Sequence, residues 1–150
     1  TNVVNAAAGT NSTYTYTIID NDGVPSVYYV GAPYGVTEGA TSQTVTVSLT
    51  HSQGQTVTVD YATSDGTALA GSDYSSTTGM LTWTEAESGE KEFSVPILDD
   101  TPFESNEHFY VILSGPSNCT ISLSKRILAN HCCVTISRRS MPHLSGRSAA

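Results

Sequence analysis

Long runs of alanine, leucine, glutamate and lysine are absent from this chain of 150 residues, so its sequence lacks the usual pattern of a stable helix. No apolar run approaches the roughly 20 residues that a helix needs to cross a bilayer, so we expect no direct membrane insertion. Threonine, serine, valine and tyrosine are frequent instead, and glycine and proline are spread along the chain. This composition favours an all-β domain with a hydrophobic core of ordinary size.

Basic residues are scarce in the first 124 positions, which contain one lysine and all 14 acidic residues, a net charge of −13. The other five basic residues give positions 125–150 a net charge of +5. An acidic body repels nucleic acid and anionic membrane surfaces, and the basic tail is too sparse to reverse this. We therefore expect no nucleic-acid partner.

Cysteine is too rare for a disulfide scaffold, with three residues in the last third of the chain. Cys132 and Cys133 are adjacent, a spacing that matches no zinc site, and a soft-metal site that includes His131 is the alternative. The sequence has no Gly-x-Ser-x-Gly, no glycine-rich phosphate loop and no His-Glu-x-x-His. These absences predict a protein that is not an enzyme.

Apolar and polar residues alternate in about seven short runs separated by turn residues, a pattern typical of an immunoglobulin-like antiparallel β-sandwich with Greek-key connections. The predicted strands span residues 27–30, 43–50, 56–63, 80–84, 92–98, 107–114 and 133–136. Residues 14–19 form a further predicted strand, which ends in a turn before the short joint Val24-Pro25. The predicted core consists of Val45, Val47, Leu49, Val57, Val59, Tyr61, Leu81, Trp83, Phe93, Val95, Ile97, Phe109, Val111 and Leu113.

The stretch from Asp99 to Glu107 contains four carboxylates in nine residues and lies between two predicted strands. Like charges on a short loop repel one another, and a bound cation relieves that repulsion. Ca²⁺ suits such a loop because it takes 6–8 oxygen ligands at roughly 2.3–2.6 Å. A solvated acidic turn explains the same residues without an ion, and the stretch alone leaves both interpretations open.

The run VDYATSDGTA from Val59 to Ala68 is followed by AGSDY from Ala70 to Tyr74, by GMLTW from Gly79 to Trp83 and, after the acidic stretch, by Glu107-His108-Phe109. This succession resembles the Calx-beta repeat, a family found in sodium–calcium exchangers and in tandem arrays of extracellular adhesion proteins. The resemblance covers about residues 26–114. It implies a seven-stranded sandwich that binds Ca²⁺ at one end, next to the junction with a neighbouring repeat.

The resemblance also implies which residues bind the ion, by carrying the acidic ligands of the family over to matching positions. These are the side chains of Glu38, Asp73, Asp99, Asp100, Glu104 and Glu107, with the carbonyl of Pro102 as a further oxygen. Because a sandwich gathers alternate loops at the same end, carboxylates distant in sequence can meet at one ion. Asp60 is predicted to lie on the outward face of its strand, and Asp65 to form a turn before Gly66.

The resemblance fails after residue 136, where family members continue into an aspartate-rich run and this chain has Ser137-Arg138-Arg139. Guanidinium groups repel a cation, which predicts weaker affinity or fewer ions. The expected ending does match residues 16–22. The resemblance therefore implies a linker and the last strand of a preceding repeat in residues 1–23, a sandwich in 24–136 and an irregular tail in 137–150. Exchange of strand 14–20 between two molecules, giving a strand-swapped dimer, is a further hypothesis.

The resulting hypothesis is a non-enzymatic Ca²⁺-binding repeat that stiffens the junctions of a multi-repeat surface or secreted protein of cell adhesion or cell communication. Its expected partners are neighbouring repeats of the same protein and other surface proteins, and its expected location is extracellular or at the cell surface. The chain begins at Thr1 without a signal-peptide pattern, and we interpret it as an excerpt from a longer chain. A structural or adhesive sandwich that binds no calcium is the alternative.

Overall fold

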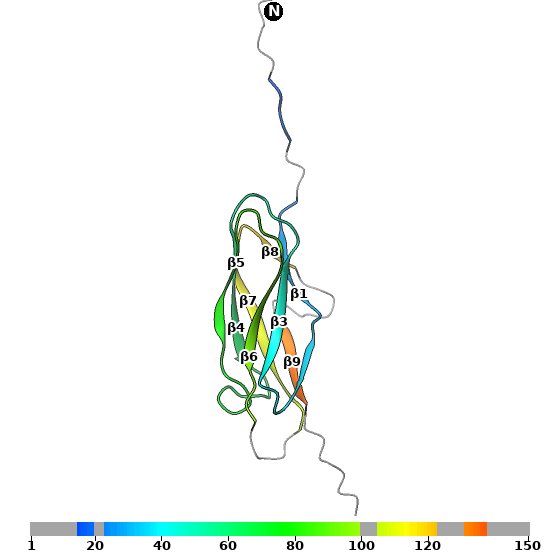
Figure 1. The fold of residues 1–150 in the computed structure, drawn as a ribbon, viewed down its shortest axis with the longest axis vertical. Helices are drawn as coiled ribbons and strands as arrows, with labels where there is room; N and C mark the ends of the chain where they lie inside the picture. The colour runs from blue at the N-terminus through cyan, green and yellow to red at the C-terminus, as the bar shows by residue number, and fades with distance from the viewer. Residues whose placement is uncertain (1–14, 20–22, 100–104, 123–130, 138–150) are drawn as a thin grey trace, which may run out of the picture.

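Nine strands in two sheets form a β-sandwich in the computed structural model, which describes residues 15–19, 23–99, 105–122 and 131–137 (Figure 1). The strands are β1 (Ser26–Val30), β2 (Tyr34–Thr37), β3 (Ser42–Leu49), β4 (Val57–Asp65), β5 (Thr78–Trp83), β6 (Gly89–Pro96), β7 (Glu107–Ser117), β8 (Thr120–Ile121) and β9 (His131–Ser137). No helix long and apolar enough to span a bilayer occurs within these ranges.

The first sheet has the order β6-β3-β1-β8 and the second the order β2-β9-β7-β4-β5. Neighbouring strands are antiparallel except for β1 with β8 and β2 with β9, which are parallel. The predicted sandwich is confirmed, with two strands more than expected. One is β8, a pairing of two residues, and the other is β2, which follows a break at Gly31 and carries the chain into the second sheet. The φ of Gly31 is +76°, a conformation that favours glycine.

The core lies between the two sheets and is made by the inward-facing residues of both. All predicted core residues are buried except Tyr61, which is half-buried and stacks on Phe93 with a ring-centroid distance of 3.8 Å. Sequence patterns missed the contributions of β1, of β9 and of the connection between β4 and β5. The missed buried residues are Val27, Tyr29, Ala68, Tyr74, Cys132, Val134 and Ile136.

The prediction of a strand at residues 14–19 is wrong for the part that the structure describes. Residues 15–19 pair with no strand and extend away from the sandwich (Figure 1). The side chains of Tyr16, Ile18 and Ile19 are exposed. Their alternation is that of a strand, but a strand needs a partner for its backbone N–H and C=O groups. The last-strand position that this segment was expected to resemble is filled by β9, which lies between β2 and β7.

The alternation of side chains along β9 points the adjacent residues Cys132 and Cys133 to opposite faces of the sheet. Cys132 on β9 is fully buried in the core, and its neighbours His131 and Cys133 point to the opposite face of the sheet. Burial raises the pKa of the Cys132 thiol to about 12, so it behaves as a small apolar side chain. The arrangement does not bring His131, Cys132 and Cys133 to one soft-metal ion.

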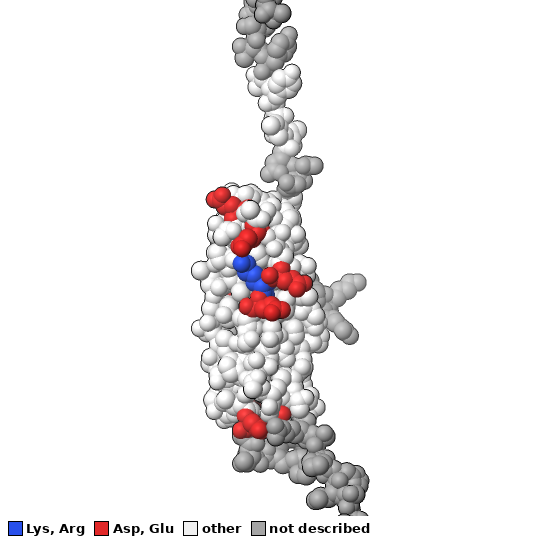
Figure 2. Space-filling view, viewed as in Figure 1, with Lys and Arg blue, Asp and Glu red and all other residues white. Residues whose placement is uncertain are grey.

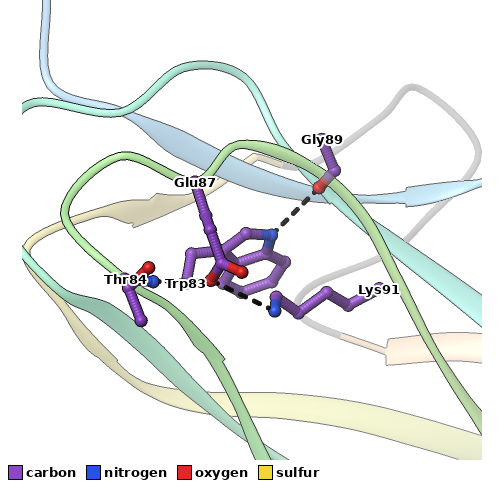
Figure 3. Close-up of polar contacts among 5 residues, drawn as sticks. All are labelled: Trp83, Thr84, Glu87, Gly89 and Lys91. Carbon is purple, nitrogen blue, oxygen red and sulfur yellow. Dashed lines mark hydrogen bonds and ion pairs between the residues drawn. The ribbon is translucent and has the colours of Figure 1, made fainter.

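Acidic side chains occupy two separate regions of the face seen in Figure 2. The first surrounds Lys91 on β6, whose Nζ lies 3.3 Å from Oε2 of Glu87 (Figure 3). Oε2 of Glu87 also accepts a hydrogen bond from the backbone N–H of Thr84, and the indole Nε1 of the buried Trp83 donates to the carbonyl of Gly89. This network links the end of β5 in one sheet to the start of β6 in the other. The second acidic region lies at the other end of the sandwich (Figure 2).

Candidate metal centre

Strands β2, β6 and β9 end, and β7 begins, at the lower end of the sandwich in Figure 1. We call this the acidic end, because Glu38, Asp73, Asp99 and Glu107 all belong to it. A pocket opens here, with an empty volume of about 280 Å³ that includes space open to solvent. Its lining consists of Glu38, Asp73, Leu98, Ser105, Glu107, Ile136 and Ser137.

Glu38 comes to the pocket because β2 and β9 run in parallel and end together. Thr37, the last residue of β2, is in register with Ser137, the last residue of β9. The backbone N–H of Glu38 continues this pairing by donating to the carbonyl of Ser137 at 2.8 Å. Glu38 and Ser137 are therefore held side by side although 98 residues separate them.

Asp73 comes from a turn in the connection between β4 and β5. Its Oδ2 accepts a hydrogen bond of 2.6 Å from the backbone N–H of Leu69, and its own N–H donates to the Leu69 carbonyl at 3.0 Å. Gly71 lies within the turn with φ +93°, a conformation that favours glycine. The carbonyl of Asp73 accepts from the N–H of Leu98, which ties the turn to the chain leaving β6.

Glu107 is the first residue of β7 and is in register with Ile136 of β9. It is half-buried, and both residues line the pocket. Asp99 directly follows Leu98, another lining residue, and its side chain is exposed. Of the predicted ligands, the structure thus brings Glu38, Asp73 and Glu107 to one pocket and places Asp99 next to its lining.

The remaining predicted ligands, Asp100, Pro102 and Glu104, lie outside the described residues. Asp60 is exposed on β4. Asp65 has a more specific role than the predicted turn former, because its Oδ1 accepts hydrogen bonds from the Tyr74 hydroxyl at 2.5 Å and from the Ala70 N–H at 3.0 Å. The Tyr74 hydroxyl, followed by the Ala70 N–H, holds the pKa of the Asp65 carboxyl below its ordinary value.

The ligand chemistry of the pocket is that of a hard cation, since its three acidic side chains offer only oxygen. Among the residues that the structure describes, no three or more His, Cys, Asp or Glu side chains are grouped closely enough to hold a metal ion. Ca²⁺ needs 6–8 oxygens, so it would need donors beyond these three carboxylates, and the acidic stretch 99–107 supplies such residues in sequence. The residue types at this end therefore fit Ca²⁺.

The chain was compared with models of known protein families. Residues 20–137 match the Calx-beta domain, which is most of the chain. The chain belongs to the Calx-beta domain family. Calx-beta domains are non-catalytic modules, which agrees with the absence of catalytic motifs from the sequence.

This Calx-beta domain is similar to segments of sodium/calcium exchangers. It is 37% identical to human sodium/calcium exchanger 2 over 95 residues, 63% of this chain and 10% of the exchanger. It is 51% identical to human sodium/calcium exchanger 3 over 61 residues, 41% of this chain and 6% of the exchanger. The chain thus spans about a tenth or less of the length of these relatives.

Solved structures give the same fold. The crystal structure of the apo form of the Calx CBD1 domain matches with a TM-score of 0.69 and 28% identity, over 79% of this chain and all of that one. The crystal structure of the calcium binding domain CBD12 of CALX1.1 matches with a TM-score of 0.65 and 29% identity, over 75% of this chain and 44% of that one. Both likenesses support the two-sheet sandwich described above.

Sequence reasoning missed four residues that line the pocket, Leu98, Ser105, Ile136 and Ser137. None of them carries a charge, so no charge pattern marks them. The sequence did give one indication that Ser137 lies at the site, because the resemblance implies acidic ligands directly after residue 136.

Proposed function

We propose that this domain binds Ca²⁺ at the acidic end through Glu38, Asp73 and Glu107, together with Asp99, Asp100, Glu104 and the carbonyl of Pro102. The observation that carries the proposal is that three carboxylates from three distant parts of the chain line one pocket. The family supports it as well, since one of the similar structures is the calcium binding domain CBD12 of CALX1.1. Ca²⁺ neutralises the mutual repulsion of the carboxylates and links the elements that carry them.

The proposed effect of the ion is mechanical. Glu38 and Ser137 are paired where the chain leaves β9, and the chain enters the sandwich at the opposite end, near Ser26 (Figure 1). An ion beside Ser137 fixes the direction in which the chain continues. In a protein with several such repeats this stiffens the junction between neighbours, and we propose this role for a surface or secreted protein of cell adhesion or communication.

The basic residues after Ser137 set the expected strength of binding. Arg138 and Arg139 follow Ser137 in sequence, where the resemblance implies acidic residues, and positive charge opposes the binding of a cation. We therefore expect weaker binding, or fewer ions, than in a family member with the complete set of carboxylates.

The test is thermal unfolding of the chain with and without millimolar Ca²⁺, followed by the fluorescence of Trp83, its only tryptophan. Ion binding to the folded state raises its stability by RT ln(1 + [L]/Kd), about 2.7 kcal/mol when calcium is at 100 times the Kd. We expect a rise in Tm that Asp73→Ala abolishes and that Asp60→Ala, an equal loss of charge on β4, retains. A Tm that does not change on addition of Ca²⁺ would contradict the calcium proposal and favour the alternative, a structural or adhesive module that binds no ion.

Neighbouring repeats of the same protein and other surface proteins remain the proposed partners. The exposed apolar residues Tyr16, Ile18 and Ile19 support pairing of this segment with another polypeptide, including strand exchange with a second copy. Elution of the chain as a strict monomer at high concentration would count against strand exchange.

A further inference from the structure

Asp65 lies outside the pocket lining, yet its carboxylate holds the turn that carries Asp73. Asp65 is the last residue of β4, and its Oδ1 accepts hydrogen bonds from the Tyr74 hydroxyl and from the Ala70 N–H. Inside the turn, Leu69 N–H donates to Oδ2 of Asp73 at 2.6 Å. The residue that supplies the pocket carboxylate is therefore flanked by two residues that Asp65 anchors.

The ring of Tyr74, whose hydroxyl donates to Asp65, is held in place by the core. Only 1% of its surface is exposed, and its ring stacks on Phe109 with a centroid distance of 4.2 Å and an interplanar angle of 14°. Phe109 is fully buried on β7, two residues after Glu107. Since the ring is fixed by the core, the hydroxyl presents a donor of fixed position to Asp65, and their hydrogen bond sets the distance between the end of β4 and the turn.

The same connection contacts the elements that carry the other carboxylates of the acidic end. The carbonyl of Asp73 accepts from Leu98 N–H at 2.9 Å, immediately before Asp99. The N–H of Ala68 donates to the carbonyl of His108 at 2.9 Å, immediately after Glu107. A shift of the turn would therefore move Asp73 relative to both neighbours.

We propose that Asp65 is a positioning residue for the calcium site, acting through Tyr74 and Ala70 to hold the Asp73 carboxylate in place. This inference rests on the proposed function. Groups that orient metal ligands through hydrogen bonds contribute about 10- to 100-fold to metal affinity in other sites, although they never touch the ion. Asp65 has the geometry of such a group, because it bonds the turn on both sides of Asp73 without lining the pocket.

The experiment is calcium titration by calorimetry, at a temperature well below unfolding, of Tyr74→Phe, Asp65→Ala and the double variant. Both single changes break the hydrogen bond between Tyr74 and Asp65, and Asp65→Ala also breaks the one from the Ala70 N–H. We therefore expect Tyr74→Phe to raise the Kd for Ca²⁺ about tenfold, Asp65→Ala to raise it at least as much, and the double variant to add little beyond Asp65→Ala. Asp65→Asn keeps an oxygen that can accept both hydrogen bonds and should restore most of the affinity. Asp60→Ala removes one charge from the same strand and should leave the Kd unchanged.

A second readout needs no calcium. Amide hydrogen exchange of Leu69 in the calcium-free protein reports its bond to Asp73, and we expect Tyr74→Phe to speed this exchange while the amides of Val59 and Val111 keep theirs. An unchanged Kd and an unchanged Leu69 exchange in Tyr74→Phe would overturn the positioning role. If the wild type binds calcium and Asp73→Ala does not, the proposed function survives that result, whereas a wild type that binds no calcium overturns both.

Discussion

Gly66→Ala is the substitution that most directly tests how the acidic end is packed. A Cβ added to Gly66 would lie 2.4 Å from the backbone carbonyl oxygen of His108 and 2.8 Å from its ring. Ordinary contacts of this kind begin near 3.4 Å, so the connection must move by about 1 Å. That movement strains the hydrogen bond from Ala68 N–H to His108 O, and the bond of 3.0 Å from His108 N–H to Oγ1 of Thr67.

Overpacking costs about 1–3 kcal/mol and a weakened hydrogen bond about 1 kcal/mol, so the free energy of unfolding should fall by about 3 kcal/mol. For a domain of this size the Tm should fall by roughly 10 °C. The assay is thermal and urea unfolding monitored by the fluorescence of Trp83, which is fully buried. Gly35→Ala is the matched control, because a Cβ at Gly35 meets nothing within 4 Å. A Tm of Gly66→Ala within about 2 °C of this control would refute the packing argument.

Two further predictions concern charge at the same end. Ser137→Asp adds a carboxylate to the pocket lining beside Glu38, so we expect it to raise calcium affinity in a calorimetric titration, and an unchanged or weaker affinity would contradict the ligand set. Asp65 has a pKa below its ordinary value of 3.8, so its ionised form stabilises the fold above that pH, and this contribution is lost as pH falls through the lower folded pKa. The Tm difference between wild type and Tyr74→Phe, which removes the main cause of the shift, should therefore shrink from pH 5 to pH 2, and a constant difference would refute this assignment.

The burial of residues in regular strands was predictable from the sequence, because it depends on one pattern, the alternation of side chains between the two faces of a sheet. Along β3, β4, β6 and β7 every second residue faces the other sheet, so the period of two identifies the buried set without knowledge of the partner strands. Tyr61 shows the limit of this rule, since it points inward but lies where its ring is covered only in part, against Phe93. The alternation gives the face, and the exposed fraction depends on the partner.

Residues in irregular segments were not predictable in this way. Tyr74 and Ala68 are fully buried, but the connection between β4 and β5 has no period that would mark them. Its order comes from contacts distant in sequence, such as the stacking of Tyr74 on Phe109 and the hydrogen bond from Ala68 to His108. For residues 15–19 the error is the reverse. Their alternation is regular and predicts a strand, but they pair with no strand among the described residues.

The convergence of the pocket carboxylates needed the strand pairing as well as the sequence. Glu38 and Ser137 meet because β2 pairs in parallel with β9, and no local pattern encodes that pairing. The resemblance to Calx-beta repeats supplied the residues, and the register of β7 with β9 places Glu107 opposite Ile136, next to Ser137. Whether these residues bind an ion stays a prediction that the titrations address.

The two acidic regions of the surface differ in how their charge is balanced. Around the connection between β5 and β6, Lys91 pairs with Glu87. The hydrogen bond from the Thr84 N–H, followed by Lys91, holds the pKa of the Glu87 carboxyl below its ordinary value. No Lys or Arg is present in the lining of the pocket at the acidic end, as far as the described residues show. Under the proposed function a bound Ca²⁺ supplies positive charge at this end, and the sequence continues after Ser137 with two further cations, Arg138 and Arg139. Because guanidinium groups repel a cation, the proposed calcium affinity should be lower than it would be without these two arginines, and the calorimetric titration measures it.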